Sequence, residues 1–433
     1  MSERSGGKEI QFIRRVFRGY REFYTSDPEI IVSAPGRIDF LNTHQDYKGL
    51  PVIAVGINLR TYVAAGRNLY SNHVTAVSEN LRDSGERYVD SFDLDGMSID
   101  KSRWFGSYVR AAVKTLIIEG YDLKPFNIWI YSEIPMGAGL GSSGTLLVSI
   151  IYSISELHRF NLDPGRIAEL AYVAEHDVLG IPCGRLDQYA AAFGGVSIID
   201  TRPPYKVSKI DLGKGFFVVF DSGIRHSTSD IHPRRQAEID KGLEMLRSII
   251  PQDLRSMIQG GYNSVYWEGL REEVLEPYLQ SLPHPYSSRI LYTLKAHRST
   301  LDAVRILRGE KISSRDLDYI IRDLEIFLGE KPRIENDDLS MIGAIMTYQH
   351  SLLSRLYEVS LPALDEIVFR AISYGALGAK LSGAGLGGVV IALARDRRTS
   401  EKILRGVLED RLAVRGWIVE IDRGVSRHEI SRE

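Results

Sequence analysis

Apolar residues occur at two different spacings along the chain, and together they predict a protein built from both strands and helices. From Glu29 to Val63, the β-branched runs EIIVSAP and PVIAVGINLRTYVAA are typical of two strands that flank a polar loop. The segment NHVTAVS, from Asn72 to Ser78, predicts another strand. We therefore expect the first part of the chain to begin with a sheet.

Helical spacing begins further along. From Trp104 to Glu119, apolar residues recur every three or four positions, which predicts an amphipathic helix. The predicted strand FNIWIYSEI follows, and the next segment, PMGAGLGSSGTLLVSIIYSISEL, leads from glycines into a second helix. RIAELAYVAEHDVLG predicts a helix that ends at Gly180, and RLDQYAAAFGG predicts one that begins near Asp187.

The second half starts with the predicted strand FFVVFDSG, Phe216 to Gly223, and is dominated by helical spacing. With 433 residues, the chain is long enough for two domains of about 200 residues each. We place the boundary near Thr201 to Lys206, which predicts one domain over residues 1–205 and another over 206–433.

Composition narrows the range of partners. The 54 Lys and Arg residues nearly balance the 56 Asp and Glu residues, so a basic surface for nucleic acid or an anionic membrane is not predicted. A small molecule is the expected partner. Cys183 is the only cysteine, which excludes an internal disulfide and a thiolate zinc site. The N-terminus has no signal-peptide pattern and no run of about 18 apolar residues occurs, so we expect a cytoplasmic protein.

The loop between the first two predicted strands gathers polar side chains that suit chemistry. It reads SAPGRIDFLNTHQDYKGL and places Arg37, Asp39, His44 and Asp46 close together. A solvated loop in which these side chains satisfy one another is one interpretation. A pocket that faces the hydroxyls of a small polar molecule is the other, and this stretch alone does not decide between them.

The glycine-rich segment PMGAGLGSSG is a candidate phosphate-binding loop. Its glycines allow successive backbone N–H groups to converge on an anion, and the following helix N-terminus adds partial positive charge. A simple turn between a strand and a helix is the alternative. The segment is neither a Walker A loop, since no Gly-Lys-Ser/Thr follows, nor a Rossmann fingerprint, since it lacks an acidic partner at the next strand end.

Six segments in a fixed order resemble the GHMP kinases, and specifically their galactokinase branch. They are the opening APGR…HQDYKG signature, the loop PMGAGLGSS, EHDVLGIPCGRLDQYAAAFG, DSGIRHSTSDIHPRR, IGAIMTYQHSLLSRLYEVSLPALD and LSGAGLGGVVIAL. The resemblance spans Ala34 to about Leu393. It implies a two-domain α+β fold: an N-terminal domain like domain 2 of ribosomal protein S5, a C-terminal GHMP kinase domain, mixed or antiparallel sheets, and an active site between the domains.

The resemblance also implies how each residue contributes to phosphoryl transfer. Asp187 matches the catalytic base that accepts the proton of the sugar's anomeric hydroxyl, and Arg37 matches the arginine that keeps this aspartate ionised. Ser142 and Glu175 match the Mg²⁺ ligands. The residues that would bind ATP lie in two glycine segments: Pro135, Gly137, Ala138, Gly139, Leu140, Gly141, Ser142, Ser143 and Gly144, with Gly383 and Gly385 from the second segment.

Single residues have simpler interpretations when taken alone. Asp187 could be a helix N-cap, because Asp side chains accept backbone N–H bonds at helix starts. Glu175 could be a solvated helix residue, and the glycines of LSGAGLGGVV could serve close packing. Their joint occurrence favours function for Arg37, Asp46, Ser142, Glu175 and Asp187, whereas His176 and Cys183 have no assigned role.

The sugar-binding residues depart from those of the galactokinase branch in two segments. The residues that would bind substrate are Thr43, His44, Asp46, Gly184 and Ile231. The branch usually has Gly-Glu where this chain has Asn42 and Thr43, and that glutamate meets the C6 hydroxyl. It has Ser-Glu-Tyr where this chain has Ser-Asp-Ile, ending at Ile231. A lost carboxylate would remove repulsion against an acidic C6 group and leave a hydroxyl able to donate.

We therefore expect an ATP- and Mg²⁺-dependent kinase that phosphorylates the C1 hydroxyl of galactose or a related sugar such as galacturonate. Two alternatives stay open: a GHMP kinase for a non-sugar alcohol, such as mevalonate or homoserine, and a catalytically silent sensor of sugar and ATP. The HQDY signature weighs against the first, and intact Ser142, Glu175 and Asp187 weigh against the second. The sequence leaves the oligomeric state and the preferred nucleotide open.

Overall fold

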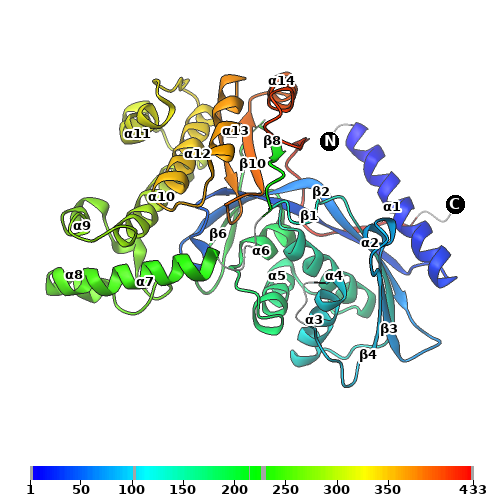
Figure 1. Ribbon diagram of the computed structural model, residues 1–433. Coiled ribbons are helices and arrows are strands. Elements are labelled where there is room, and N and C mark those ends of the chain that lie inside the picture. Colours follow the sequence, from blue (N-terminus) through cyan, green and yellow to red (C-terminus); the bar gives the residue numbers. More distant parts are fainter. Residues whose placement is uncertain (1–2, 101–103, 214, 226–230, 431–433) are drawn as a thin grey trace.

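The strands of the computed structural model form two separate sheets (Figure 1). The structure describes residues 3–100, 104–213, 215–225 and 231–430. The strands run β1 Ile30–Leu41, β2 Val52–Arg67, β3 His73–Ser78, β4 Val89–Asp93, β5 Phe126–Ser132, β6 Val196–Ile199, β7 Val207–Ile210, β8 Phe216–Asp221, β9 Gly378–Ser382, β10 Val389–Ala394, β11 Arg415–Val419 and β12 Ser426–His428.

The first sheet contains eight strands and is mixed. Its main path is β12-β1-β2-β5-β3-β4, and β6 and β7 extend it by pairing from β2. Only β3 and β5 among these neighbours are parallel. The long β1–β2 hairpin runs from Ile30 opposite Ala65 to Leu41 opposite Ile53, so the predicted polar loop lies at its closed end. The register shifts twice in β1, once before Gly36 and once after Asp39.

The second sheet has four antiparallel strands in the order β11-β8-β10-β9. Strand β10 is buried along its whole length, as expected for a central strand covered on both faces.

Helices cover both sheets. Their bounds are α1 Glu3–Tyr24, α2 Glu79–Asp83, α3 Phe105–Ile118, α4 Ser142–His158, α5 Pro164–Val173, α6 Leu186–Phe193, α7 Ile231–Ile249, α8 Gln252–Met257, α9 Glu272–Leu279, α10 Tyr286–Leu307, α11 Asp318–Leu328, α12 Asp338–Arg355, α13 Pro362–Ser373 and α14 Arg397–Glu409.

Alternate residues of the first sheet enter two different cores. Val32 and its same-face neighbours pack against α3, α4, α5 and α6, whereas Ile31 packs with Val16 and Tyr20 of α1 on the other face. Figure 1 shows α1 lying along this outer side of the sheet, with the short helix α2 beside it. The first sheet is thus covered on both faces, and α4 and α6 carry the predicted loop and base against β1.

The second part of the molecule is organised around α12. Its residues from Ser340 to Leu353 are all buried, and it contacts α10, α11 and β9. The core that forms here continues into the first part through Ile38 and Phe40 of β1. The polar loop therefore lies where the two parts meet.

The predicted α+β architecture is confirmed, and several details were not foreseen. The helix α1 was not predicted at all. The predicted division after residue 205 stays a prediction, but the pairing shows that β7, just beyond it, and the distant β12 both belong to the first sheet. Within the described residues, no helix is both long enough and apolar enough to cross a membrane.

Candidate active site

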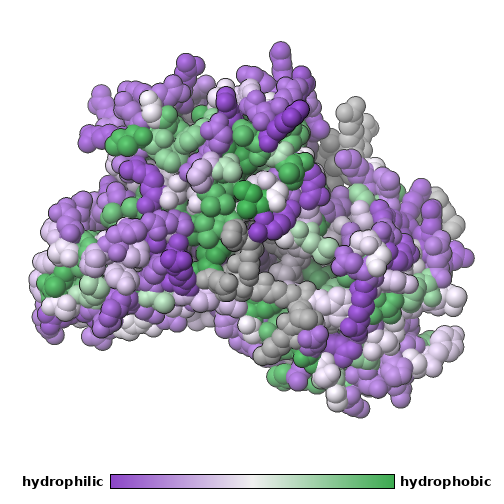
Figure 2. Space-filling view, in the orientation of Figure 1, coloured by the Kyte–Doolittle hydropathy of each residue, from purple (hydrophilic) through white to green (hydrophobic). Residues whose placement is uncertain are grey.

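A cleft of about 1020 Å³ lies between the two parts of the molecule. Its lining comes from the polar loop, the glycine loop and the start of α6 on one side, and from His232, Gly383 and Arg415 on the other. Figure 2 shows that hydrophilic side chains cover most of the face in view and that apolar ones gather near its centre. The cleft is large enough for two small substrates to lie side by side.

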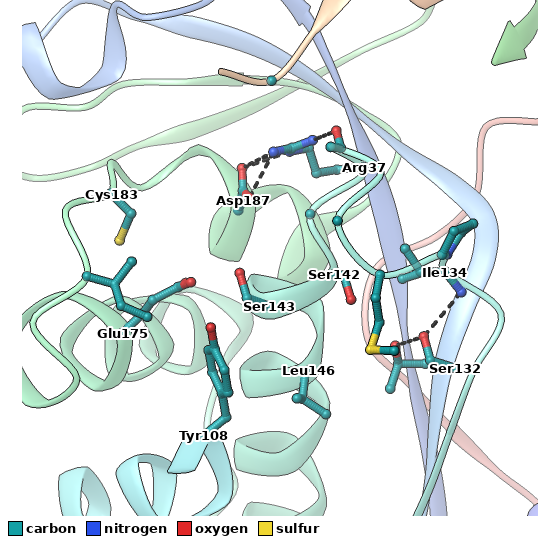
Figure 3. A pocket seen from close by; sticks show the side chains of 18 of the residues that line it. Arg37, Tyr108, Ser132, Ile134, Ser142, Ser143, Leu146, Glu175, Cys183 and Asp187 are labelled. Carbon is teal, nitrogen blue, oxygen red and sulfur yellow. Dashed lines mark hydrogen bonds and ion pairs between the residues drawn. The ribbon is translucent and has the colours of Figure 1, made fainter. Parts of the chain in front are cut away.

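Arg37 and Asp187 form a bidentate ion pair inside the cleft (Figure 3). Nε of Arg37 donates to Oδ1 at 2.7 Å, and Nη2 donates to Oδ2 at 2.8 Å. The arginine side chain is only 7% exposed, whereas that of Asp187 is 29% exposed and faces the cavity. The third guanidinium nitrogen, Nη1, donates to the backbone oxygen of Gly139 in the glycine loop. One arginine thus joins the predicted base to the predicted phosphate site.

The glycine loop adopts the conformation that a phosphate cradle needs. Gly137, Gly139 and Gly141 have φ angles of 68°, 74° and 74°, which side-chain-bearing residues rarely adopt. The loop leads directly into α4, which begins at Ser142, so the N–H groups left without helical partners belong to a helix start that lines the cleft.

The predicted ATP-binding residues fall into two groups. Those that line the cleft are Pro135, Gly137, Gly139, Gly141, Ser142, Ser143 and Gly383. The rest serve packing: Ala138 and Leu140 are fully buried in the core, and a Cβ on Gly144 would lie 2.8 Å from Cβ of Asp187. A Cβ on Gly385 would lie 2.2 Å from the backbone oxygen of Val359. The prediction that these four contact ATP has no support from the lining of the cleft.

Glu175 lies close to Ser143, not to its neighbour Ser142. Glu175 is 4% exposed, on a π-helical turn over Ala174–Val178, and accepts a hydrogen bond from Nε2 of Gln188 at 2.7 Å. Burial raises the pKa of Glu175 to about 7, a hydrogen bond from Ser143 opposes this rise, and the charge of Asp187 adds to it. Figure 3 shows Ser142 on the far side of the helix start, beside Ile134. The predicted pairing of Ser142 with Glu175 is corrected accordingly.

The surroundings of Glu175 suit a magnesium ion. Buried Oε1 of Gln188 has no hydrogen-bond partner among the residues that the structure describes, and it belongs to the residue that already contacts Glu175. A carboxylate, a hydroxyl and a free amide oxygen are the hard donors that Mg²⁺ prefers. Among the described residues, no group of three or more His, Cys, Asp or Glu could hold a metal by itself. Any ion here would need further ligands from bound phosphate.

Thr43 is part of a buried network with a carboxylate and an ammonium group. Its hydroxyl donates to Oδ1 of Asp39 at 3.0 Å and accepts from Nζ of Lys380 at 2.7 Å. Nζ of Lys380 also donates to the backbone oxygen of Asp39 at 2.9 Å. Burial raises the pKa of Asp39 and lowers that of Lys380 to about 8. The single hydroxyl proton of Thr43 is therefore already committed, which contradicts the expectation of a hydroxyl free to donate to substrate.

Asp46 approaches the backbone of Gly184 very closely. A Cβ on Gly184 would lie 1.6 Å from Oδ2 of Asp46. Burial, together with the charges of Asp39 and Asp187, raises the pKa of Asp46 to about 6, and hydrogen bonds from the backbone N–H groups of Tyr47 and Leu186 oppose this rise. Asp46, Gly184 and Asp187 all line the cleft, as the sequence predicted.

His44 lines the cleft too, but both of its ring nitrogens already have protein partners. Nε2 lies 3.0 Å from the backbone oxygen of Ala384, so it must donate, and Nδ1 then accepts from the hydroxyl of Tyr47 at 3.2 Å. Burial places the pKa of His44 well below its usual value, so the ring is neutral. His44 contributes shape to the pocket, with no ring nitrogen left over.

Ile231 is not among the residues that line the cleft, contrary to the prediction. Its side chain is 6% exposed and belongs to the apolar core of the second part. The next residue, His232, lines the cleft instead, in the first turn of α7. Residues 226–230 of the same predicted segment lie outside the described residues.

Two arginines that the sequence did not single out flank the glycine loop. Arg225 and Arg415 both donate to fully buried Asp221, and Arg415 lines the cleft. A Cβ on Gly137 would lie 3.9 Å from Cδ of Arg225. Arginine side chains held beside a loop of free N–H groups attract phosphate. The sequence offered one signal for this cluster of charges: Asp221 is the last residue of a strand.

The cleft also has an apolar extension next to the start of α4. Its lining includes aromatic and aliphatic side chains that the sequence did not identify as functional: Leu81, Trp104, Phe105, Tyr108, Ile130, Ile134 and Leu146. Figure 3 shows Tyr108 and Leu146 beneath the glycine loop. A flat heterocycle attached to a phosphate chain in the loop would fit such surroundings.

Three segments of the chain match known families. Residues 18–67 match the galactokinase galactose-binding signature, residues 107–195 the GHMP kinases N terminal domain, and residues 331–412 the GHMP kinases C terminal domain. The first match contains the polar loop, the second contains the glycine loop and Asp187, and the third contains Gly383.

Similar proteins and structures agree with these matches. A galactokinase of Pyrococcus furiosus is 29% identical over 394 residues, which cover 90% of this chain and 95% of that protein. A galactokinase of Roseiflexus sp. is 29% identical over 380 residues, which cover 86% of this chain and 85% of that protein. The structure of Lactococcus lactis galactokinase complexed with galactose superimposes with a TM-score of 0.77 at 22% identity, covering 96% of this chain and 99% of that one.

Proposed function

The chain belongs to the GHMP kinases, in their galactokinase-like branch, and we infer that it is a phosphotransferase that phosphorylates an alcohol group of a small molecule. We propose the C1 hydroxyl of a galactose-like sugar as the acceptor and ATP as the donor. The observation that carries this proposal is the Arg37–Asp187 pair, because its arginine also holds the backbone of the glycine loop.

We propose a separate task for each group. Asp187 accepts the proton of the sugar hydroxyl, since its carboxylate faces the cleft beside the loop. Arg37 holds that carboxylate in place and offsets charge on the transferred group. The free N–H groups at the start of α4, with Arg225 and Arg415 opposite, bind the phosphates. The apolar extension takes the base of the nucleotide.

Glu175 and Ser143 would hold a magnesium ion on the side of the phosphates, with the free amide oxygen of Gln188 nearby. When bound, the ion neutralises phosphate charge and orients the transferred group. The carboxylate of Glu175 is buried and shares its surroundings with Asp187, so a cation relieves the repulsion between them.

Asp39 argues for a neutral group at C6. In the galactokinase branch the residue that corresponds to Thr43 is a glutamate, which meets the C6 hydroxyl. Here Asp39 lines the cleft and supplies a carboxylate beside Thr43. A carboxylate accepts a hydrogen bond from a hydroxyl and repels a second carboxylate. We therefore propose galactose or another sugar with a neutral C6 group as substrate, in preference to galacturonate.

The experiment is coupled ADP release with galactose, galacturonate, 6-deoxygalactose, mevalonate and homoserine, using Asp187→Asn as the inactive control. We expect turnover of galactose and at least tenfold lower kcat/KM for galacturonate. Preference for galacturonate would contradict the role given to Asp39. Turnover of mevalonate or homoserine, with none of the sugars, would mean that the substrate is a non-sugar alcohol. Tight sugar binding without any turnover would mean that the protein is a sensor.

A further inference from the structure

One of the imidazoles that line the cleft, that of His232, has no hydrogen bond to any other described residue. Neither ring nitrogen of His232 takes part in a hydrogen bond with another described residue, and its Nδ1 is buried and unpartnered. Burying a polar atom without a partner is unfavourable unless a ligand or water completes its bonding. His232 is not one of the residues that the sequence singled out.

Neighbouring rings hold His232 in place. Its ring centroid lies 5.1 Å from that of His44 and 5.3 Å from that of Tyr47. Burial lowers the pKa of His232 to about 4, although the nearby charge of Asp187 opposes this effect. The ring is therefore neutral, with one nitrogen that donates and one that accepts, and it can bind a hydroxyl in either sense.

The comparison with His44 shows which of the two rings is available. Ala384 and Tyr47 use both nitrogens of His44, so this ring has no capacity left for a ligand. His232 packs against His44, and neither of its nitrogens is hydrogen-bonded to another residue that the structure describes. Of these two imidazoles in the cleft, which meet edge to face, the one from α7 is equipped to bind a ligand.

We propose that His232 is a specificity-determining residue that hydrogen-bonds one ring hydroxyl of the bound sugar. This inference rests on the proposed sugar kinase function. It places a contact from the second part of the molecule opposite Asp46 and Asp187, so the sugar is held from both sides of the cleft. A hydroxyl that His232 binds is selected, because a sugar lacking it leaves the imidazole unpaired again.

The test is His232→Phe, which keeps a ring against His44 and Tyr47 and removes both nitrogens. We expect kcat/KM for the sugar to fall about tenfold or more, mainly through KM, with an unchanged KM for ATP. The matched control is His297→Phe. His297 is also buried with an unpartnered Nδ1, but it lies on α10 and does not line the cleft. Its replacement should leave the KM for the sugar unchanged.

A panel of 2-, 3-, 4- and 6-deoxygalactose identifies the hydroxyl and separates recognition from folding. In the parent, loss of the hydroxyl that His232 binds should lower kcat/KM, and in His232→Phe the same loss should cost nothing further. A structural effect would instead lower activity equally for all sugars and lower Tm. An unchanged KM in His232→Phe, or deoxy-sugar penalties all as large as in the parent, would overturn the inference. An inactive parent would instead refute the proposed function.

Discussion

Replacing Gly184 with alanine should impair recognition of the sugar with no change of charge. A Cβ at this position would lie 1.6 Å from Oδ2 and 2.2 Å from Cγ of Asp46. Non-bonded heavy atoms approach to about 3.5 Å, so Oδ2 of the carboxylate must move by about 1.9 Å. Gly184 has no positive φ, so the backbone itself accepts alanine, and the effect comes from this contact alone.

The effects of this displacement on catalysis and on stability can be estimated. The displacement pulls Asp46 away from the backbone N–H of Leu186, the first residue of α6 and the neighbour of the proposed base Asp187. A misplacement of about 1 Å costs on the order of 100-fold in rate, so kcat/KM for the sugar should fall by about 10². Overpacking should lower the free energy of unfolding by about 1–3 kcal/mol. KM for ATP should stay close to that of the parent.

Steady-state kinetics and urea unfolding measure both effects. The matched control is Gly7→Ala, because a Cβ there meets nothing within 4 Å on the exposed side of α1. A second arm places Gly184→Ala in an Asp46→Ala background, where no carboxylate remains to be displaced. The reasoning is refuted if Gly184→Ala keeps the kcat/KM of the parent, or if its loss is equally large in the Asp46→Ala background.

Three further predictions concern charge. Asp187→Asn should lower kcat by about 10²–10⁴ while ATP binding, measured by calorimetry, persists. Glu175→Gln should raise the Mg²⁺ concentration needed for half-maximal activity, and EDTA should abolish turnover in both proteins. Burial alone would raise the pKa of Asp221, but bonds from Arg225, the Gly223 backbone and Arg415 outweigh it and lower the pKa to about 2. Since this is below the unfolded value, Asp221 stabilises the fold by about 2 kcal/mol at neutral pH and by about half of that at pH 3. Urea unfolding of Asp221→Asn should show a deficit that shrinks over this range, and a constant deficit would contradict the assignment.

Features that depend on neighbouring residues were predictable from the sequence. Helix α4 begins at Ser142, directly after the glycines, and α6 begins at Leu186, next to the predicted Asp187. The hairpin of β1 and β2 around the polar loop was predictable because both strands have long β-branched runs. Local patterns therefore located these segments, whereas the roles of Asp187 and Arg37 are implied by the resemblance to the GHMP kinases and stay predictions.

Which of two adjacent residues faces the cleft could not be predicted in the same way. Successive helical residues point about 100° apart, so the starting residue of a helix decides which side chain enters the site. This is why His232 lines the cleft where Ile231 was expected, and why Glu175 meets Ser143 where Ser142 was expected.

Long-range partners were out of reach of local patterns. Lys380 meets Thr43 from 337 positions away. Asp39 did carry a signal, because residues two apart in a strand share a face and Arg37 was already assigned to the site. We propose that its carboxylate, which accepts a hydrogen bond from Thr43, supplies the acid on the C6 side that position 43 lacks.

The position of β12 has a consequence for how the protein is made. β12 pairs with β1 through Ile31 and His428, and Arg60 of β2 donates to the side chain of Asp422 and the backbone of Gly424. At roughly 5–20 residues per second, a ribosome needs roughly 20–70 s to travel from β2 to β12. Throughout that time β1 has an open edge and Arg60 lacks its carboxylate partner. The part of the chain that carries the polar loop is therefore made first, but the sheet to which it belongs gains its last strand only at the end of synthesis.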